Sequence, residues 1–343
     1  MGLVNTLKFD THSGAMITDE EFFIGGRRRV HTADNMQSLL DEEMSNEFQL
    51  ETVYGGSGNI AITGQVINDI KTELRKQFED FKKRGKTGKI FTTVEDVSRI
   101  ALKMFQDNSR KYVNRKLSGL FGFNLDDFNR GYFFSNDKKI EIKEDKIISK
   151  AMDIIMLKSS YMKDINELEG LIIGSDRYFG FNAFDFYGQM THLYVSTSLY
   201  NSLGAGSTTS SLAFGELINT LSLEQRRNGV DRIFGLTELI RITNQTAIKN
   251  SEIGGYYDII YINAKGKDHS ERFFEITGDE SQFLKEAVTA YDNGLISKEV
   301  CYSLVDKLVF GKADFDLQEA ENFLFSNSGD SNKLELLLRG YKI

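Results

Sequence analysis

One segment has some of the residue types of a phosphate-binding loop. Gly85-Lys86-Thr87-Gly88-Lys89 is similar to a phosphate-binding loop, in which backbone N–H groups and a lysine hold the phosphates. That loop requires a glycine five positions before the Gly-Lys pair, but Asp80 stands there, and a charged helical pattern precedes the segment where a strand is required. We therefore do not expect nucleotide binding.

Metal and thiol chemistry have no better support. The histidines are His12, His31, His192 and His269, and they lack the spacing of paired metal ligands. Cys301 is the single cysteine, which excludes an intrachain disulfide and thiolate metal clusters, and its apolar neighbours predict a core position. We expect neither a metal nor a cofactor.

Two segments near the start of the chain have a plain structural interpretation. Arg27, Arg28 and Arg29 would suit an acidic partner surface, but so short a run of charge is usually a solvated face. The opening residues 1–6 fit the N-myristoylation pattern. The same residues also read as a first strand, which we favour.

Composition sets limits on the class of protein. The chain has 343 residues, 40% of them hydrophobic, which is enough for one large domain or two. A net charge of −8 and a pI near 5.3 argue against nucleic acid and membrane surfaces as partners. No run of 18 apolar residues and no secretory leader pattern occur. We expect a soluble, cytoplasmic protein.

Any functional side chains must be positioned by strands and helices, which the hydrophobic pattern predicts. Alternation over residues 3–9 and 15–18 predicts two strands joined by a polar turn. Residues 48–54 predict another strand, followed by a glycine-rich turn at residues 55–59. A helix with an apolar stripe should follow, and Thr93 has the features of the cap of a second helix.

The second half of the chain repeats this alternation of strands and helices. An apolar strand is expected at residues 169–176, and an aromatic strand pair at residues 178–195 that turns near Gly188. Two helices follow, the first opened by Gly204-Ala205-Gly206-Ser207. Residues 256–263 are β-branched and aromatic and predict a central strand, with a hairpin partner at residues 271–277.

This order of elements describes two sheets enclosed by helix layers, a four-layered αββα sandwich of the α+β class. Residues 1–107 and 166–277 would form the core. Residues 108–165 have weak periodicity and would be an insertion, and residues 278–343 a helical C-terminal extension.

Four segments carry a resemblance to a known family, and they cover roughly two-thirds of the chain in the right order. The hairpin around Gly14, residues 56–67, residues 203–207 and residues 250–260 resemble the corresponding parts of proteasome β subunits, and most closely those of the bacterial homologue Anbu. The resemblance implies the N-terminal nucleophile hydrolase fold and assembly into rings or larger arrays. It also implies a peptide or protein substrate, or a regulatory partner.

Members of that family attack the peptide carbonyl with the hydroxyl of an N-terminal threonine, whose free α-amine is the general base. Aligned on Gly14, the threonine position falls on Val4, or on Asn5 after a shift of one residue. Neither side chain is a usable nucleophile. Thr6 is the nearest hydroxyl, but a chain beginning there would have a shortened first strand.

The supporting positions are also mostly altered. Glu20 matches the acidic residue, with Asp19 and Glu21 as alternatives in register. The lysine position falls on Glu47, and the remaining three supporting positions fall on Ala205, Asn250 and Ile253. Ser207 and Ser251 lie close enough in sequence to restore part of the set after a small shift.

Two hypotheses follow. The favoured one is a catalytically degenerate, self-assembling subunit, since a working site requires its groups to be placed very accurately. The alternative is an active threonine peptidase in which processing exposes Thr6, with Glu20, Ser207 and Ser251 in supporting roles.

Overall fold

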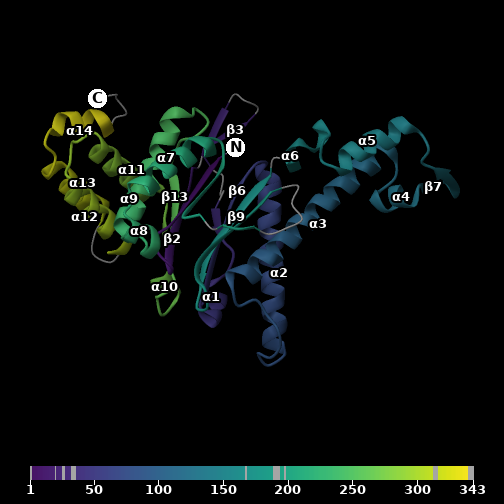
Figure 1. Ribbon diagram of the computed structural model, residues 1–343, viewed down its shortest axis with the longest axis horizontal. Helices are drawn as coiled ribbons and strands as arrows, with labels where there is room; N and C mark the ends of the chain where they lie inside the picture. Colours follow the sequence, from purple (N-terminus) through teal and green to yellow (C-terminus); the bar gives the residue numbers. More distant parts are fainter. Residues whose placement is uncertain are drawn as a thin grey trace.

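The structure is a computed structural model. It describes residues 2–19, 21–24, 28–31, 36–166, 168–187, 194–196, 198–311 and 316–338. The chain is a mixed α+β protein in which helices cover antiparallel sheets (Figure 1).

The first large sheet has the strand order β12-β1-β2-β13-β14, and all its pairings are antiparallel. Its strands are β1 (Leu3–Lys8), β2 (Ser13–Asp19), β12 (Tyr200–Gly204), β13 (Tyr257–Asn263) and β14 (Phe273–Ile276). The predicted first hairpin is confirmed, with Val4 opposite Thr18. Its turn is closed by Asp10, whose carboxylate accepts from the N–H groups of His12 and Ser13.

The second large sheet has the order β11-β10-β9-β6-β5. Its strands are β5 (Met36–Ser38), β6 (Leu50–Ser57), β9 (Glu169–Asp176), β10 (Gly180–Tyr187) and β11 (Tyr194–Val195). The predicted strands at residues 169–176 and 178–195 are confirmed by β9, β10 and β11, whereas Gly188 lies outside the described residues.

The prediction of a turn at Gly55 and Gly56 is wrong, because β6 continues to Ser57. A Cβ on Gly55 would lie 2.6 Å from Met16 Sδ and 2.8 Å from Val4 Cγ1, both on the first sheet. Gly55 therefore permits close approach of the two sheets, and the chain turns at Gly58, where φ is +122°.

The first sheet is covered by helices from the second half of the chain. These are α7 (Ser207–Thr220), α8 (Leu223–Asn228), α9 (Arg232–Lys249), α11 (Gly278–Asp292), α12 (Lys298–Phe310), α13 (Leu317–Ser326) and α14 (Ser331–Leu338). One apolar cluster joins most of these helices to the sheet, including Leu7, Ile259, Leu239 and Cys301, which confirms the predicted core position of the cysteine.

The second sheet is covered by α2 (Ile60–Lys83) and α3 (Val94–Phe121), with α1 (Glu42–Phe48) at one end. The predicted stripe of α2 is buried, and Thr93 caps α3 in a capping box with Asp96. A separate cluster lies between the sheets and includes Val4, Met16, Val53 and Ile173.

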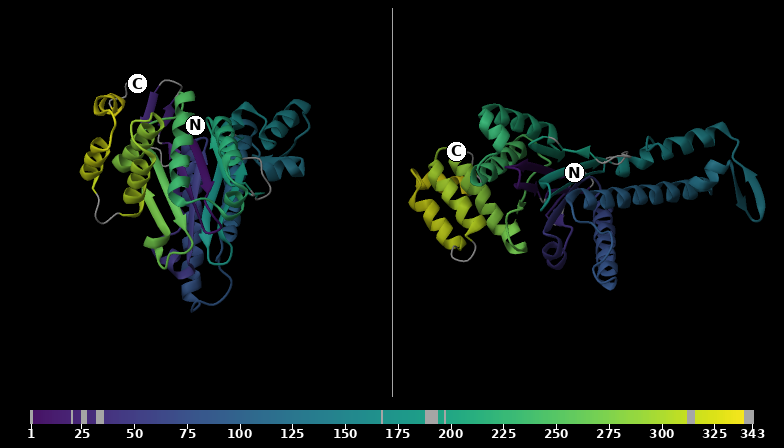
Figure 2. Two further views of the ribbon diagram at one scale, coloured as in Figure 1. Left: turned by 60° about the vertical axis from the view of Figure 1, so that its left-hand side comes forward. Right: turned by 60° about the horizontal axis from the view of Figure 1, so that its bottom comes forward.

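The distal part of α3 extends away from the sheets (Figures 1 and 2). It carries α4 (Leu125–Arg130), the hairpin of β7 (Tyr132–Ser135) and β8 (Lys138–Glu141), and α5 (Asp145–Ile155). The chain returns through a 3₁₀ turn (Ser160–Met162) and α6 (Lys163–Asn166). We call residues 108–165 the arm. The arm has its own apolar cluster, which includes Val113, Phe123 and Ile154.

Two further short elements complete the described chain. The strands β3 (Glu21–Ile24) and β4 (Arg28–His31) form a hairpin after β2. The helix α10 (His269–Arg272) connects β13 to β14, so the predicted partner strand at residues 271–277 begins two residues later than expected.

Candidate functional site at one end of the sheets

The carboxylate of Asp19 organises the end of the first sheet where β1 begins. Its Oδ1 accepts from the Leu3 N–H at 2.6 Å, and its Oδ2 accepts from the Gly254 N–H at 3.1 Å. Asp19 is fully buried at the last position of β2. A buried carboxylate is stabilised by such charge-assisted hydrogen bonds, so Asp19 ties the start of β1 to the loop before β13.

Gly2, directly ahead of β1, is packed against two other segments. Its carbonyl oxygen accepts from Ser57 Oγ at 3.4 Å. A Cβ on Gly204 would lie 2.0 Å from the same oxygen, and Gly204 has φ of +83°, so only glycine suits this position of β12. The Gly204 N–H donates to Glu169 Oε2 at 3.1 Å, which links the two sheets at this end.

The turn that opens α7 contacts the C-terminal end of α9. A Cβ on Gly206 would lie 2.5 Å from Ile253 Cδ1 and 2.8 Å from Thr246 Cγ2. Asn250, at the C-cap of α9, donates from Nδ2 to Thr246 O at 2.8 Å. Three of the segments that carry the family resemblance therefore meet at this end of the sheets, together with the open end of the first hairpin, whose turn near Gly14 lies at the other end.

The first residues of β1 offer no hydroxyl or thiol at this end. Gly2 has no side chain, Leu3 is buried, and Val4 packs in the cluster between the sheets. Asn5 points to the helices instead, where its Nδ2 donates to Ser210 Oγ at 3.2 Å and to Thr243 Oγ1 at 3.0 Å. Residues 2–5 therefore provide no hydroxyl that could attack a peptide carbonyl with the help of its own α-amine.

Thr6 lies in the interior of β1, between Met16 of β2 and Asn201 of β12. It is buried, and its Oγ1 accepts from the Asn201 N–H at 3.2 Å. Thr6 and Lys8 line a recess of about 10 Å³, which has room for no more than about one water molecule. Lys8 donates from Nζ to Phe181 O at 3.0 Å, and burial lowers the pKa of its amine.

The other predicted catalytic residues lie in different parts of the structure. Ser207 is half-buried at the first position of α7, and Ser251 is exposed just after α9. The segments that carry Ser207 and Ser251 contact each other at Gly206. Thr6 lies apart from them, three residues after Leu3 and so roughly 10 Å farther along β1. Glu20 lies outside the described residues.

Glu47, which the sequence places at the lysine position just before a strand, lies near the end of the helix that precedes β6. It belongs to α1, and its Oε2 accepts from Lys86 Nζ at 2.6 Å in a solvent-exposed ion pair. In the sheet, β6 pairs with β9 on one side and with β5 on the other, where Met36 lies opposite Gly55.

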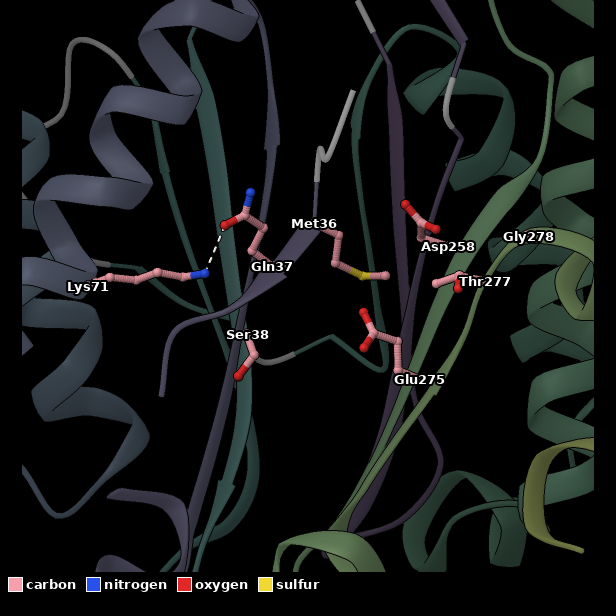
Figure 3. A pocket seen from close by; sticks show the side chains of 8 residues that line it. All are labelled: Met36, Gln37, Ser38, Lys71, Asp258, Glu275, Thr277 and Gly278. Atoms are coloured by element: carbon pink, nitrogen blue, oxygen red, sulfur yellow. Dashed lines mark hydrogen bonds between the residues drawn. The ribbon is translucent and has the colours of Figure 1, made fainter. Parts of the chain in front are cut away.

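An open cleft of about 590 Å³ adjoins the Asp19 end of the first sheet (Figure 3). It lies between β5 at the edge of one sheet and β13 and β14 at the edge of the other. Met36 and Glu275 point into this space from opposite sides (Figure 3). The lining consists of Met36, Gln37, Ser38, Lys71, Asp258, Glu275, Thr277 and Gly278.

The cleft has two carboxylates on one wall, and an ammonium group and neutral groups on the other. Asp258 is half-buried and lies opposite Thr18 in the sheet, while Glu275 is exposed on β14. Across the gap, Lys71 donates from Nζ to Gln37 Oε1 at 2.8 Å (Figure 3). The lining therefore carries charges of both signs. Sequence reasoning missed this site because Asp258 and Glu275 occupy alternate strand positions that read as ordinary solvated charges.

Among the described residues, no group of three or more His, Cys, Asp or Glu side chains is placed to hold a metal ion. The described helices also include none long and apolar enough to cross a membrane.

Comparison with known proteins gives a match in structure but not in sequence. No protein-family model matches the chain, and no curated protein matches it. The structure is similar to that of Anbu (ancestral beta-subunit) from Yersinia bercovieri, with a TM-score of 0.51 and 13% identity, over 85% of this chain and 94% of that one. It is also similar to an Anbu (Gly-1) mutant from Hyphomicrobium sp. strain MC1, with a TM-score of 0.52 and 10% identity, over 86% and 95%. The expected resemblance is thereby confirmed at the level of the fold.

Proposed function

We propose that this chain, which shares the fold of Anbu, is a catalytically degenerate proteasome-like subunit that assembles with copies of itself into a ring or larger oligomer. The likeness in fold supports the assembly, and the residues at the start of β1 support the loss of catalysis.

The observation that carries the proposal is the absence of a nucleophile on residues 2–5. The Asp19 end retains a buried carboxylate, a glycine turn and the close approach of four segments. However, its polar groups bind backbone atoms of the same chain, as Asp19 does with Leu3 and Gly254. In a subunit with a purely structural role, the Asp19 end of the sheets has to be rigid but needs no catalytic groups.

The proposed architecture is the four-layered αββα sandwich. Three apolar clusters support it, one under each helix layer and one between the sheets. In this division residues 1–107 and 166–277 form the core, the arm is an insertion, and residues 278–343 are an extension. We place the protein in the cytoplasm.

Exposed apolar side chains on the outer helices support assembly. Leu212 on α7 is 69% exposed and Ile248 on α9 is 82% exposed. Leu223 on the intervening α8 is 71% exposed. A contact with a second copy would bury such exposed apolar side chains.

Native mass spectrometry with intact-mass measurement on the same sample tests the proposal. We expect a closed oligomer of chains beginning at Met1 or Gly2, and no covalent adduct with a peptide epoxyketone, an electrophile that reacts with an N-terminal threonine and its amine. A strict monomer at micromolar concentration would exclude the assembly. A chain beginning at Thr6 that forms the adduct would instead establish the alternative, a threonine peptidase.

A further inference from the structure

A second cleft, of about 230 Å³, lies at the end of the first sheet opposite Asp19, beside the turn between β1 and β2. Its lining includes three cationic side chains, Lys8, Arg226 and Arg227, and a single carboxylate, that of Asp10. The protein as a whole carries a net charge of −8. The cleft is therefore a locally positive site in an acidic protein.

The three segments that form the cleft are fastened together by their backbones. The Lys8 N–H donates to Leu199 O at 2.7 Å, and the Val230 N–H donates to Phe9 O at 2.7 Å. Gly229 has φ of +99°, and a Cβ there would lie 2.1 Å from Phe9 O, so glycine allows this close approach. The cationic side chains are thus held near one another by fixed segments.

The half-buried amine of Lys8 lacks an ion-pair partner in the part of the chain that the structure describes. Its Nζ donates to the neutral Phe181 O at 3.0 Å. Burial lowers the pKa of this amine, and the charge of Asp10 opposes the effect only in part. The Asp10 carboxylate is already engaged in its own turn, where Oδ1 accepts from the N–H groups of His12 and Ser13 and from Ser13 Oγ.

The two arginines lie exposed on α8 and also lack carboxylate partners among the described residues. Arg226 is held in place by neutral acceptors, since Nε donates to Leu221 O at 3.0 Å and Nη2 to Asn219 O at 2.9 Å. Its Nη1 has no described acceptor, and Arg227 forms no hydrogen bond or ion pair with any described residue. Guanidinium groups with free N–H donors suit oxyanions.

The inner end of the cleft also has more donors than acceptors. It adjoins the recess of about 10 Å³ described above, and the two share Lys8, Ser196 and Ser198 in their linings. On the recess wall, Asn201 Oδ1 accepts from Ser196 Oγ at 2.6 Å. The buried Nδ2 of Asn201 has no hydrogen-bond partner within the described chain, which is uncommon for a buried amide.

We propose that this cleft binds a small molecule that carries a phosphate group, with Lys8, Arg226 and Arg227 donating to its oxygens. A phosphate monoester has three strong acceptor oxygens and so can satisfy donors on several segments at once. The cleft is smaller than the roughly 300 Å³ at which pockets for drug-sized ligands begin, so the ligand must be small. The site lies away from the Asp19 end and depends neither on catalysis nor on assembly.

Isothermal titration calorimetry of the full chain with inorganic phosphate, at constant ionic strength, tests the site. Lys8→Met and Arg227→Gln should each weaken binding at least about tenfold, as expected for the loss of a charge-assisted hydrogen bond. The matched control is Arg115→Gln, which removes an equally exposed arginine from α3 and should bind phosphate like the wild type. Circular dichroism checks that each variant is folded.

Asp10→Asn tests the same site in the opposite direction. The asparagine oxygen can still accept from the His12 and Ser13 N–H groups, so the turn is retained. Because the substitution removes the carboxylate from the lining, phosphate should bind about twofold to fivefold more tightly. A gain in affinity cannot result from damage to the fold.

Two further probes define the class of ligand. Acetate should bind at least about tenfold more weakly than phosphate, because it offers fewer oxygens to the same donors. Tighter binding of glycerol phosphate than of inorganic phosphate would assign the rest of the cleft to the organic part of the ligand, and equal binding would assign the site to the phosphate group itself.

Four results would overturn the proposal. They are equal losses in Arg227→Gln and Arg115→Gln, no gain in Asp10→Asn, acetate that binds as tightly as phosphate, and no saturable binding by the wild type up to about 10 mM phosphate. Each would leave the proposed subunit assembly untouched, because the native mass is measured separately.

Discussion

Arg272 donates from Nε to Oε1 of Glu51 at 3.0 Å, although the residues are 221 positions apart and their side chains are only 1% and 0% exposed. Glu51 lies on β6 of the second sheet, and Arg272 ends α10, which leads into β14 of the first sheet. The other carboxylate oxygen, Oε2, lies 3.0 Å from His269 Nδ1. This group joins the two sheets at the end opposite Asp19.

Removing the charge of Glu51 should destabilise the protein strongly. Glu51→Gln leaves the buried Arg272 guanidinium without its counter-charge, so we expect a loss of about 3–5 kcal/mol in the free energy of unfolding. Urea denaturation at neutral pH measures it. The control is Glu47→Gln, which breaks the exposed pair with Lys86 and should cost less than about 1 kcal/mol. Similar losses in the two variants would contradict a buried role for Glu51.

The same group should make stability depend on pH through His269. The hydrogen bond to Glu51 raises the pKa of His269 above its ordinary value of 6.5, against the opposing effect of burial; Glu42 also raises it and Arg272 lowers it. A group whose pKa is higher in the folded state than in the unfolded state stabilises the folded protein. This stabilisation is complete at pH values below the unfolded-state pKa and is lost as the pH rises through the folded-state pKa. The wild type should therefore exceed His269→Gln in stability more at about pH 5.5 than at about pH 8.5. A difference that stays constant between these pH values would show that the imidazole does not titrate against Glu51.

Two glycines should respond in opposite directions to alanine. A Cβ on Gly174 of β9 would lie 2.3 Å from the backbone oxygen of Glu51, so Gly174→Ala should destabilise by about 1–3 kcal/mol. Gly64, inside α2, has no atom within 4 Å of that position, so Gly64→Ala should stabilise by up to about 1 kcal/mol through helix propensity. Thermal melts of both variants check the signs. A neutral Gly174→Ala would mean that β6 and β9 move apart easily at this point.

Asp19→Asn should loosen the start of β1. An amide can offer only one oxygen where the carboxylate accepts from both Leu3 and Gly254, so we expect a loss of about 1–3 kcal/mol. Hydrogen exchange of the Leu3 and Gly254 amides should accelerate as well. The control is Asp330→Asn, because Asp330 accepts from the Lys333 N–H near the start of α14, where asparagine serves equally well. Unchanged exchange at Leu3 would refute the positioning role of Asp19.

The substitution Thr6→Val tests whether the Thr6 hydroxyl has a structural or a catalytic role. Loss of the hydrogen bond from Asn201 should cost about 0.5–1.5 kcal/mol in stability. The N-terminal mass and the oligomer size should stay as in the wild type, because Thr6 acts inside an intact strand. A variant that keeps an N-terminal segment which the wild type removes would point to Thr6 as a self-processing nucleophile.

Local patterns in the sequence predicted most strands and helices of the two large sheets and their covering layers, because alternation and helical stripes reflect one-sided burial within a few neighbouring residues. It placed β1, β2, β13 and the capped start of α3 correctly. It also excluded a hydroxyl at residues 2–5. These properties are local, so they require no knowledge of distant contacts.

Which charges are buried, and where they meet, depends on contacts between segments that are distant in the sequence. Glu51, Arg272 and Asp19 look like ordinary charged residues in sequence, and their partners lie far along the chain or on the backbone. Gly55 reads as a turn residue until the other sheet is in place against it. Asp258 and Glu275 become one wall of a cleft only because β13 and β14 pair opposite β5 across the gap between the sheets. Long-range packing sets these environments, and no local pattern encodes it.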